Sequence, residues 1–130
     1  MQLLHSAARS LMAGMFIYGG LDAFRNPRSK VPKAEAIAPD IAEVVGIDAS
    51  TEQLVRINGA VQIGAGIALA AGLMPRVAAL VLAASLVPTT AAGHRFWEET
   101  DPKAKAQQTI HFLKNASMLG GLVLVVTNGG

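Results

Sequence analysis

The chain has 130 residues, of which 52% are hydrophobic and only 15% are charged, and it contains no cysteine. A soluble domain averages about 25% charged residues, so this composition favours a membrane protein over a soluble helical bundle, whose helices would need a polar face. The net charge of +2 and the lack of a basic stripe argue against nucleic acid as a partner. The absence of cysteine excludes disulfides, iron–sulfur clusters, thiol catalysis and thiolate zinc sites.

The first apolar segment, residues 3–24, predicts a membrane-spanning helix rather than a cleaved signal peptide. Its cation, Arg9, lies inside the apolar run instead of ahead of it, and no small-residue cleavage site follows. Gly14, Gly19 and Gly20 give the segment a small-residue face. In membranes such faces let helix backbones approach closely, so we expect this helix to pack tightly against another.

The next stretch, residues 25–50, is charged and contains prolines, so we expect an aqueous loop. Within it, Ile37, Ile41, Val44 and Val45 recur at helical spacing. This pattern predicts a short amphipathic helix that lies on the membrane surface.

Residues 54–73 and 76–93 predict two further spanning helices joined by a tight turn. Each is close to the roughly 20 apolar residues that cross a bilayer. Ser50 and Gln53 have the spacing of a capping box, which predicts a helix start directly after Ser50. Gly72 suits the C-terminus of that helix, because glycine readily adopts the left-handed conformation found there.

Pro88 lies inside the second helix of this hairpin, beside Thr89 and Thr90. Proline removes a backbone hydrogen bond and kinks a helix, and neighbouring hydroxyl groups can satisfy the carbonyl that is left free. We therefore expect a kink at this position, with the freed carbonyl bonded by the threonines.

Asp101 and Pro102 predict the N-cap and first position of the last helix, whose membrane-spanning part covers about residues 107–126. The predicted fold is therefore all-α, with one domain over residues 1–130. It is an antiparallel bundle of four transmembrane helices with the short amphipathic helix in its first loop.

Four spans place both termini on one side of the membrane and the two charged loops on the other. Most of the basic residues lie in or beside these loops: Arg25, Arg28, Lys30, Lys33, Arg95, Lys103 and Lys105. By the positive-inside rule we expect the loops to face the cytoplasm and both termini to face outward. Aromatic residues would then mark the cytoplasmic interface: Phe24, Phe96, Trp97 and Phe112.

This topology predicts a polar layer in the cytoplasmic half of the bundle. Its members are Asp22, Asn58, Gln62, His94, His111, Lys114 and Asn115. Unpaired polar groups are costly in hydrocarbon, so we expect these side chains to turn inward and form a ligand-binding pocket. Arg9 would be the deep cation of the opposite half.

Structural roles remain open for the same residues. Asn58, Gln62 and Asn115 suit hydrogen bonds between helices. Lys114 and Arg56 suit positions where the charge reaches the interface. Asp22 suits an ion pair with Arg25 or Lys114.

Other chemistries have little support in the sequence. His94 and His111 lack a regular metal-ligand or haem-ligand spacing, so we predict no metal site. The glycines inside the apolar segments do not form a nucleotide-binding motif and are expected to be packing residues. Neither Ser85 nor Ser117 has a base and an acid nearby in the sequence, so no catalytic residue is assigned.

Several short motifs occur in order along most of the chain. They are Arg9 with residues 14–20, residues 59–66 leading into Gly72, residues 75–79, Thr90 with residues 94–97, residues 112–115 and residues 119–121. This ordered set resembles the DoxX family of small bacterial membrane proteins, related to the membrane subunit of thiosulfate:quinone oxidoreductases. One departure is Gln62, where members of the family often have an acidic residue, which argues against a proton-coupled role there.

The resemblance implies a four-helix protein of the bacterial cytoplasmic membrane, linked in some relatives to quinone-dependent sulfur oxidation or to oxidative-stress assemblies. We therefore predict an accessory or anchoring subunit of a membrane redox or respiratory assembly, with a polar pocket for quinone or lipid and no cofactor held by the chain itself. Its expected partners are the lipid bilayer and a protein of that assembly or a second copy of the chain. A quinone-linked oxidoreductase acting on a small substrate is the alternative, and a small transporter is a third hypothesis; enzymatic activity stays open.

Overall fold

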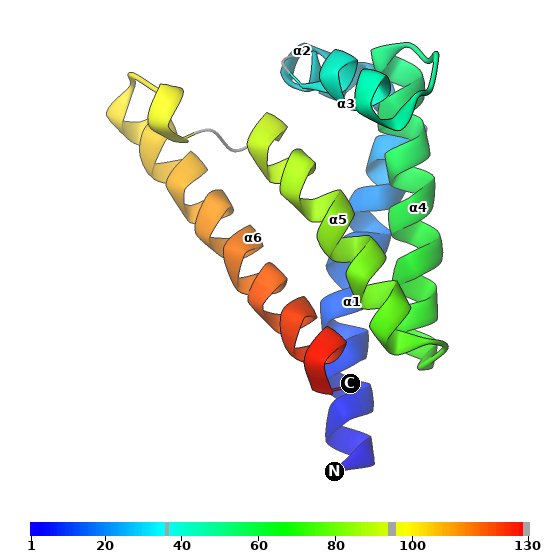
Figure 1. The fold of residues 1–130 in the computed structure, drawn as a ribbon. Helices are drawn as coiled ribbons and strands as arrows, with labels where there is room; N and C mark the ends of the chain where they lie inside the picture. Colours follow the sequence, from blue (N-terminus) through cyan, green and yellow to red (C-terminus); the bar gives the residue numbers. More distant parts are fainter. Residues whose placement is uncertain (36, 94–95, 129–130) are drawn as a thin grey trace.

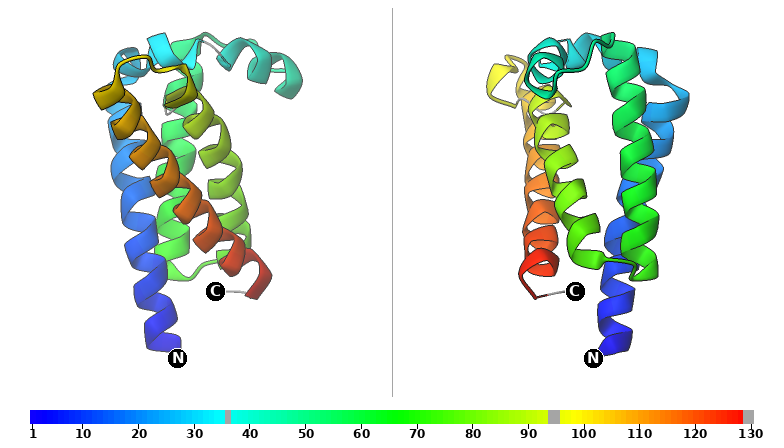
Figure 2. Two further views of the ribbon diagram at one scale, coloured as in Figure 1. Left: turned by 90° about the vertical axis from the view of Figure 1, so that its left-hand side faces the viewer. Right: turned by 45° about the vertical axis from the view of Figure 1, so that its right-hand side comes forward.

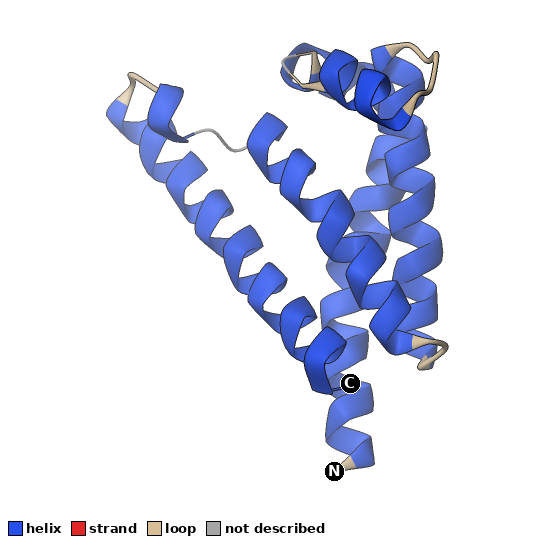
Figure 3. Cartoon of the chain, viewed as in Figure 1, coloured by secondary structure: helices blue, strands red, loops and turns tan. Residues whose placement is uncertain are grey.

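The computed structural model describes residues 1–35, 37–93 and 96–128, and this part of the chain is helical apart from short connections, with no strand (Figure 3). The predicted all-α class is therefore confirmed. The elements are α1 (Gln2–Arg25), η1 (Pro27–Lys30), α2 (Val31–Ala34), α3 (Ala38–Val45), α4 (Thr51–Ala71), α5 (Pro75–Gly93), η2 (Phe96–Glu98) and α6 (Pro102–Asn128).

Within the part of the chain that the structure describes, three helical regions are long and apolar enough to cross a membrane: α4, the region that begins with α5, and α6. The first helix, α1, is 24 residues long, but Arg9 and Asp22 lower its mean hydropathy. Its predicted passage through the membrane, and with it the four-span topology, stays a prediction.

The start of α4 follows the signal read from the sequence. The hydroxyl of Ser50 accepts a hydrogen bond from the backbone N–H of Gln53 at 3.2 Å, and the Gln53 side chain accepts one from the Ser50 N–H at 2.9 Å. This confirms the capping box, and α4 begins at Thr51, three residues before the predicted start of the membrane span. The helix ends where Gly72 adopts a left-handed φ of 74°.

The start of α6 is also confirmed. The carboxylate of Asp101 accepts a hydrogen bond from the backbone N–H of Ala104 at 3.2 Å, and Pro102 is the first helical residue. The helix continues to Asn128, so it extends past both ends of the span predicted over residues 107–126.

The four long helices run back and forth, so that both termini lie at one end of the molecule (Figures 1 and 2). We name this the terminal end, and it also holds the tight turn between α4 and α5. The opposite end, the loop end, holds the long connection from α1 to α4 and the connection from α5 to α6 (Figure 1).

The hydrophobic core lies mainly toward the terminal end. Phe16 of α1, Leu69 of α4, Leu82 of α5 and Leu122 of α6 are all buried, and Ala79 in the first turns of α5 is buried with them. Small and large apolar side chains thus fill the space between all four long helices there. The bundle is held at this end by apolar packing.

Helices α1 and α4 approach each other closely at glycines. A Cβ on Gly59 would lie 2.6 Å from the carbonyl oxygen of Gly20, and a Cβ on Gly20 would lie 2.7 Å from the carbonyl oxygen of Gly59. The predicted packing role therefore applies to Gly20, whereas Gly14 and Gly19 of the same expected face have open space at their Cβ positions.

The elements η1, α2 and α3 form a cap segment that lies across the loop end (Figure 1). Helix α3 lies where the short amphipathic helix was expected, but its apolar residues divide between two environments. Ile41 faces a cavity beneath the cap segment, whereas Val44 is 87% exposed and Val45 is 60% exposed. Gly46 ends α3 in a left-handed conformation.

Candidate functional site

A cavity of about 650 Å³ lies at the loop end, between the long helices and under the cap segment. Such a volume is typical of small-molecule sites, which range over about 300–1,000 Å³. The apolar part of its lining comes from every long helix and from the cap segment, and includes Met15, Phe16, Ile37, Ile41, Leu54, Ile57, Val61, Leu86 and Met118. The cavity is therefore mainly an apolar space that lies between α1, α4, α5 and α6.

Charged groups gather on the lining of this cavity. They are Asp22 from α1, Lys30 and Lys33 from the cap segment, and Lys114 from α6. The carboxylate of Asp22 forms an ion pair with the ammonium group of Lys30 at 2.6 Å and accepts a hydrogen bond from Asn26 at 3.2 Å. Asp22 therefore pairs within the cap region rather than with Lys114, and this pair ties the end of α1 to η1.

Side-chain hydrogen bonds join the long helices beside the cavity, in what we name the amide–hydroxyl network: Asn58, Gln62, Ser85, Thr89, Thr90 and Asn115. From α4, Gln62 donates to the Ser85 hydroxyl at 3.0 Å, and that hydroxyl donates to the Asn58 carbonyl oxygen at 2.6 Å. The Asn58 amide also donates to Thr89 at 3.1 Å. Gln62 and Ser85 are buried, so their bonds replace those that water would otherwise make.

The same network joins α5 to α6. The buried amide of Asn115 donates to the hydroxyl of Thr90 at 3.0 Å. The interhelical role left open for Asn58, Gln62 and Asn115 is therefore present in the structure.

The two threonines beside Pro88 also bond to the backbone, although not where we expected. Thr89 donates to the carbonyl of Ser85 and Thr90 donates to that of Leu86, each at 2.8 Å. The carbonyl that Pro88 leaves without its helical N–H is that of residue 84, four positions earlier. The expectation that a threonine hydroxyl bonds that particular carbonyl was therefore wrong, because a threonine reaches back four residues from its own position.

The polar-layer residues are brought together only in part. Five of them line the cavity: Asp22, Asn58, Gln62, Lys114 and Asn115. His111 is exposed on α6 and is not among the lining residues of the cavity within the described chain. His94 lies outside the described residues.

Arg9 lies apart from the cavity, toward the terminal end. Its guanidinium donates to the hydroxyl of Ser6 at 3.3 Å, and its Nη2 lies 3.1 Å from where a Cβ on Gly72 would stand. Gly72 ends α4, and a cation at a helix C-terminus is favoured by the helix dipole. Arg9 therefore joins the start of α1 to the end of α4.

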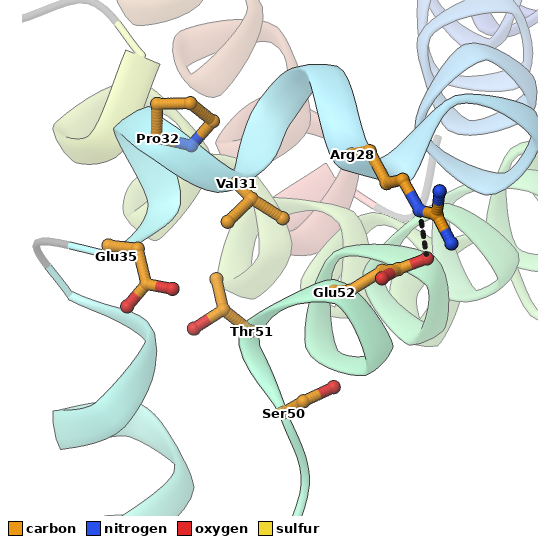
Figure 4. A pocket seen from close by; sticks show the side chains of 7 residues that line it. All are labelled: Arg28, Val31, Pro32, Glu35, Ser50, Thr51 and Glu52. Atoms are coloured by element: carbon orange, nitrogen blue, oxygen red, sulfur yellow. Dashed lines mark hydrogen bonds and ion pairs between the residues drawn. The ribbon is translucent and has the colours of Figure 1, made fainter.

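A second, shallower pocket of about 370 Å³ lies where the cap segment meets the start of α4 (Figure 4). Arg28 and Glu52 pair on one side of it, with 3.4 Å between the Arg28 Nε and a carboxylate oxygen of Glu52 (Figure 4). Glu35 points toward Thr51 on the other side of the pocket (Figure 4). The Arg28–Glu52 pair joins the cap segment to α4, and among the described residues no group of three histidine, aspartate or glutamate side chains gathers here as a metal site would require.

Aromatic rings cluster beside the start of α6. Phe96, Trp97 and Phe112 make edge-to-face contacts with ring centroids 5.2–5.8 Å apart. Phe24, the fourth member of the expected aromatic belt, instead lies under the guanidinium of Arg56 at 5.8 Å. All four rings lie at the loop end, where an interfacial belt was expected.

The lining of the cavity combines apolar side chains with a few polar and charged ones, as binding sites for small molecules do. Among the described residues no three histidine, aspartate or glutamate side chains gather as a metal site would require. Sequence reasoning missed Lys30 and Lys33 as lining residues and Ser85 as the centre of the network. Ser85 and Thr89 are four positions apart and so share a helix face, which was a usable signal.

The DoxX family model matches residues 4–95, which is most of the chain. The chain belongs to the DoxX family. The matched region runs from α1 to the connection after α5, so the α6 residues of this DoxX protein lie outside it. Comparisons with curated proteins and with solved structures gave no match.

DoxX is a family of membrane proteins, and three helical regions of this chain are suited to crossing a bilayer. A lipid bilayer is therefore the environment of this DoxX chain.

Proposed function

We propose that this DoxX protein is an accessory or anchoring subunit of a membrane redox or respiratory assembly, and that it holds a quinone or lipid molecule in the loop-end cavity. The observation that carries this proposal is the cavity itself, which combines apolar walls with polar groups from all four long helices. Its depth between helices suits a long apolar molecule that enters from the bilayer.

The chain has no cysteine, so it lacks the thiolate ligands that hold iron–sulfur clusters. A role beside a redox enzyme is therefore more consistent with its side chains than electron transfer through them. The exposed apolar side chains of the long helices, such as Leu80, Ile110 and Leu124, face lipid or a partner subunit in this proposal.

The test is purification of the tagged full-length chain from native membranes in a mild detergent, with mass spectrometry of the proteins and small molecules recovered. Stoichiometric recovery of an oxidoreductase or respiratory complex, with quinone or lipid bound, is the expected result. Recovery of the chain alone, without a bound lipid or quinone, would contradict both parts of the proposal.

A quinone-linked oxidoreductase acting on a small substrate is the second candidate, because Asp22 and Lys114 place two ionisable groups on the lining of the same cavity. It predicts quinone reduction by the purified chain and loss of that activity in Lys114→Ala. Equal rates in the wild type and the variant would exclude Lys114 from catalysis.

For the membrane topology, we propose that α1 spans the bilayer with the other three long helices. It lies along α4 and meets it at the Gly20–Gly59 contact, so exposing α1 to water would also expose that interface. Both termini would then lie on the outer side of the cytoplasmic membrane. Reporter enzymes attached to the C-terminus test this, and activity only in the cytoplasm would reverse the assignment.

A further inference from the structure

The positive charge on the cavity lining exceeds the negative charge. Asp22 is the one carboxylate among the described lining residues, and it is paired with Lys30 at 2.6 Å. No ion pair joins Lys33 or Lys114 to a carboxylate within residues 1–35, 37–93 and 96–128. Two ammonium groups, each with three N–H donors, therefore remain available to an occupant.

The amide nitrogens of the lining are already hydrogen-bonded. The amides of Asn58 and Asn115 each donate to a threonine hydroxyl of α5, and Gln62 donates to Ser85. Asn58 also accepts a bond from Ser85. A neutral head group would compete with these bonds, whereas an anionic one would bind to the lysines without breaking them.

The apolar walls of the cavity are suited to the hydrocarbon part of an occupant. Ile57, Val61 and Leu86 line it from α4 and α5, and Met118 lines it from α6. These side chains suit an acyl chain. The proposed topology places the loop end on the cytoplasmic side of the membrane, where basic pockets between helices are suited to anionic lipid head groups.

We infer that the occupant of the cavity is an anionic phospholipid, whose phosphate binds to Lys33 and Lys114 and whose acyl chain lies along the apolar wall. This inference rests on the ligand-binding part of the proposed function and selects lipid over quinone. The ion pair between Asp22 and Lys30 occupies a third lysine of the lining and so limits the number of lysines that the head group meets.

Native mass spectrometry of the full chain in mild detergent tests this, with phosphatidylglycerol and phosphatidylcholine offered at equal concentration. The wild type is expected to retain phosphatidylglycerol preferentially. Lys33→Gln with Lys114→Gln is expected to weaken that preference about fivefold per lysine and about 30-fold for the pair. The matched control is Lys103→Gln with Lys105→Gln, two exposed lysines of α6 outside the cavity lining, which should retain the preference.

A variant with the opposite expected effect excludes misfolding as the cause. Asp22→Asn removes the charge that pairs with Lys30, so a third lysine becomes available and retention of phosphatidylglycerol should rise about fivefold. Equal retention of the two lipids by the wild type, or equal preference in the wild type and the Lys33, Lys114 double variant, would overturn the inference. Displacement of the lipid by equimolar quinone, or by excess inorganic phosphate, would overturn it as well.

The experiments distinguish failure of the accessory-subunit role from failure of the lipid inference. A protein recovered with a redox complex but without lipid preference would retain the accessory role and lose the lipid inference. A protein that selects phosphatidylglycerol but copurifies with no oxidoreductase would retain the lipid site and lose that role.

Discussion

Replacing Gly59 with alanine should weaken the contact between α1 and α4. The added Cβ would lie 2.6 Å from the carbonyl oxygen of Gly20 and 2.9 Å from the backbone nitrogen of Phe24. Both neighbours are main-chain atoms, so a side chain cannot rotate away and the helices must separate. Overpacking of this kind costs about 1–3 kcal/mol, and we expect the upper part of that range.

Gly64→Ala is the matched control, because Gly64 lies in the same helix and a Cβ there would meet no atom within 4 Å. Alanine improves helix propensity over glycine by about 1 kcal/mol at either position. The difference between the two variants therefore isolates the steric cost. For a difference of 3 kcal/mol, the folded-to-unfolded ratio would fall by about two orders of magnitude relative to the control.

The assay is unfolding of the purified chain in mixed micelles as the fraction of denaturing detergent rises, followed by circular dichroism. Gly64→Ala should unfold at or slightly above the wild-type midpoint, and Gly59→Ala should unfold well below it. Coincident curves for the two variants would show that α1 and α4 do not approach as closely as the structure indicates.

Three further predictions use the same purified chain. Ser85→Ala leaves two amides of α4 without their shared hydroxyl and should destabilise the chain by about 1 kcal/mol in the unfolding assay; an unchanged midpoint would contradict the network. Gly72→Ala should cost more than Gly46→Ala, because both glycines have positive φ but only the first would bring a Cβ to 3.1 Å from Arg9, and equal costs would count against that contact. The fluorescence of Trp97, the chain's one tryptophan, should be quenched more strongly by lipids brominated near the head group than by lipids brominated at the end of the acyl chain, because Trp97 lies half-exposed at the loop end. Stronger quenching by the second kind of lipid would place Trp97 deep in the bilayer.

The ends of the helices were predictable because their signals involve residues close together in the sequence. The capping box of Ser50 and Gln53, the left-handed Gly72 and the Asp101 cap each depend on contacts within a few positions. Local sequence determines such contacts regardless of how the helices pack. The same reasoning predicted the existence of α3, although not which of its apolar side chains would face the cavity.

The sequence predicts which glycines of α4 share a face, but not which face packs against another helix. Gly59 and Gly66 are seven positions apart and share a face, whereas Gly64 lies about 140° around the helix from Gly59. Helix geometry thus separates them into two faces, but only the structure shows that the Gly59 face meets α1. The ion-pair partner of Asp22 was harder to predict, because Lys30 reaches Asp22 only when η1 folds back over the end of α1.

The two ends of the bundle are held by different forces, and this difference bears on what fills the cavity. At the terminal end, Leu69, Leu82 and Leu122 pack with no exposed surface, whereas at the loop end the helices are joined by the amide–hydroxyl network and by ion pairs of the cap segment. Directional bonds keep helices at a set separation without filling the space between them. An apolar space of about 650 Å³ therefore lies between the helices at the loop end, of the kind that binds small molecules. In the proposed topology lipid surrounds the four long helices, and the lysines of the cavity lining would favour lipids that carry an anionic head group.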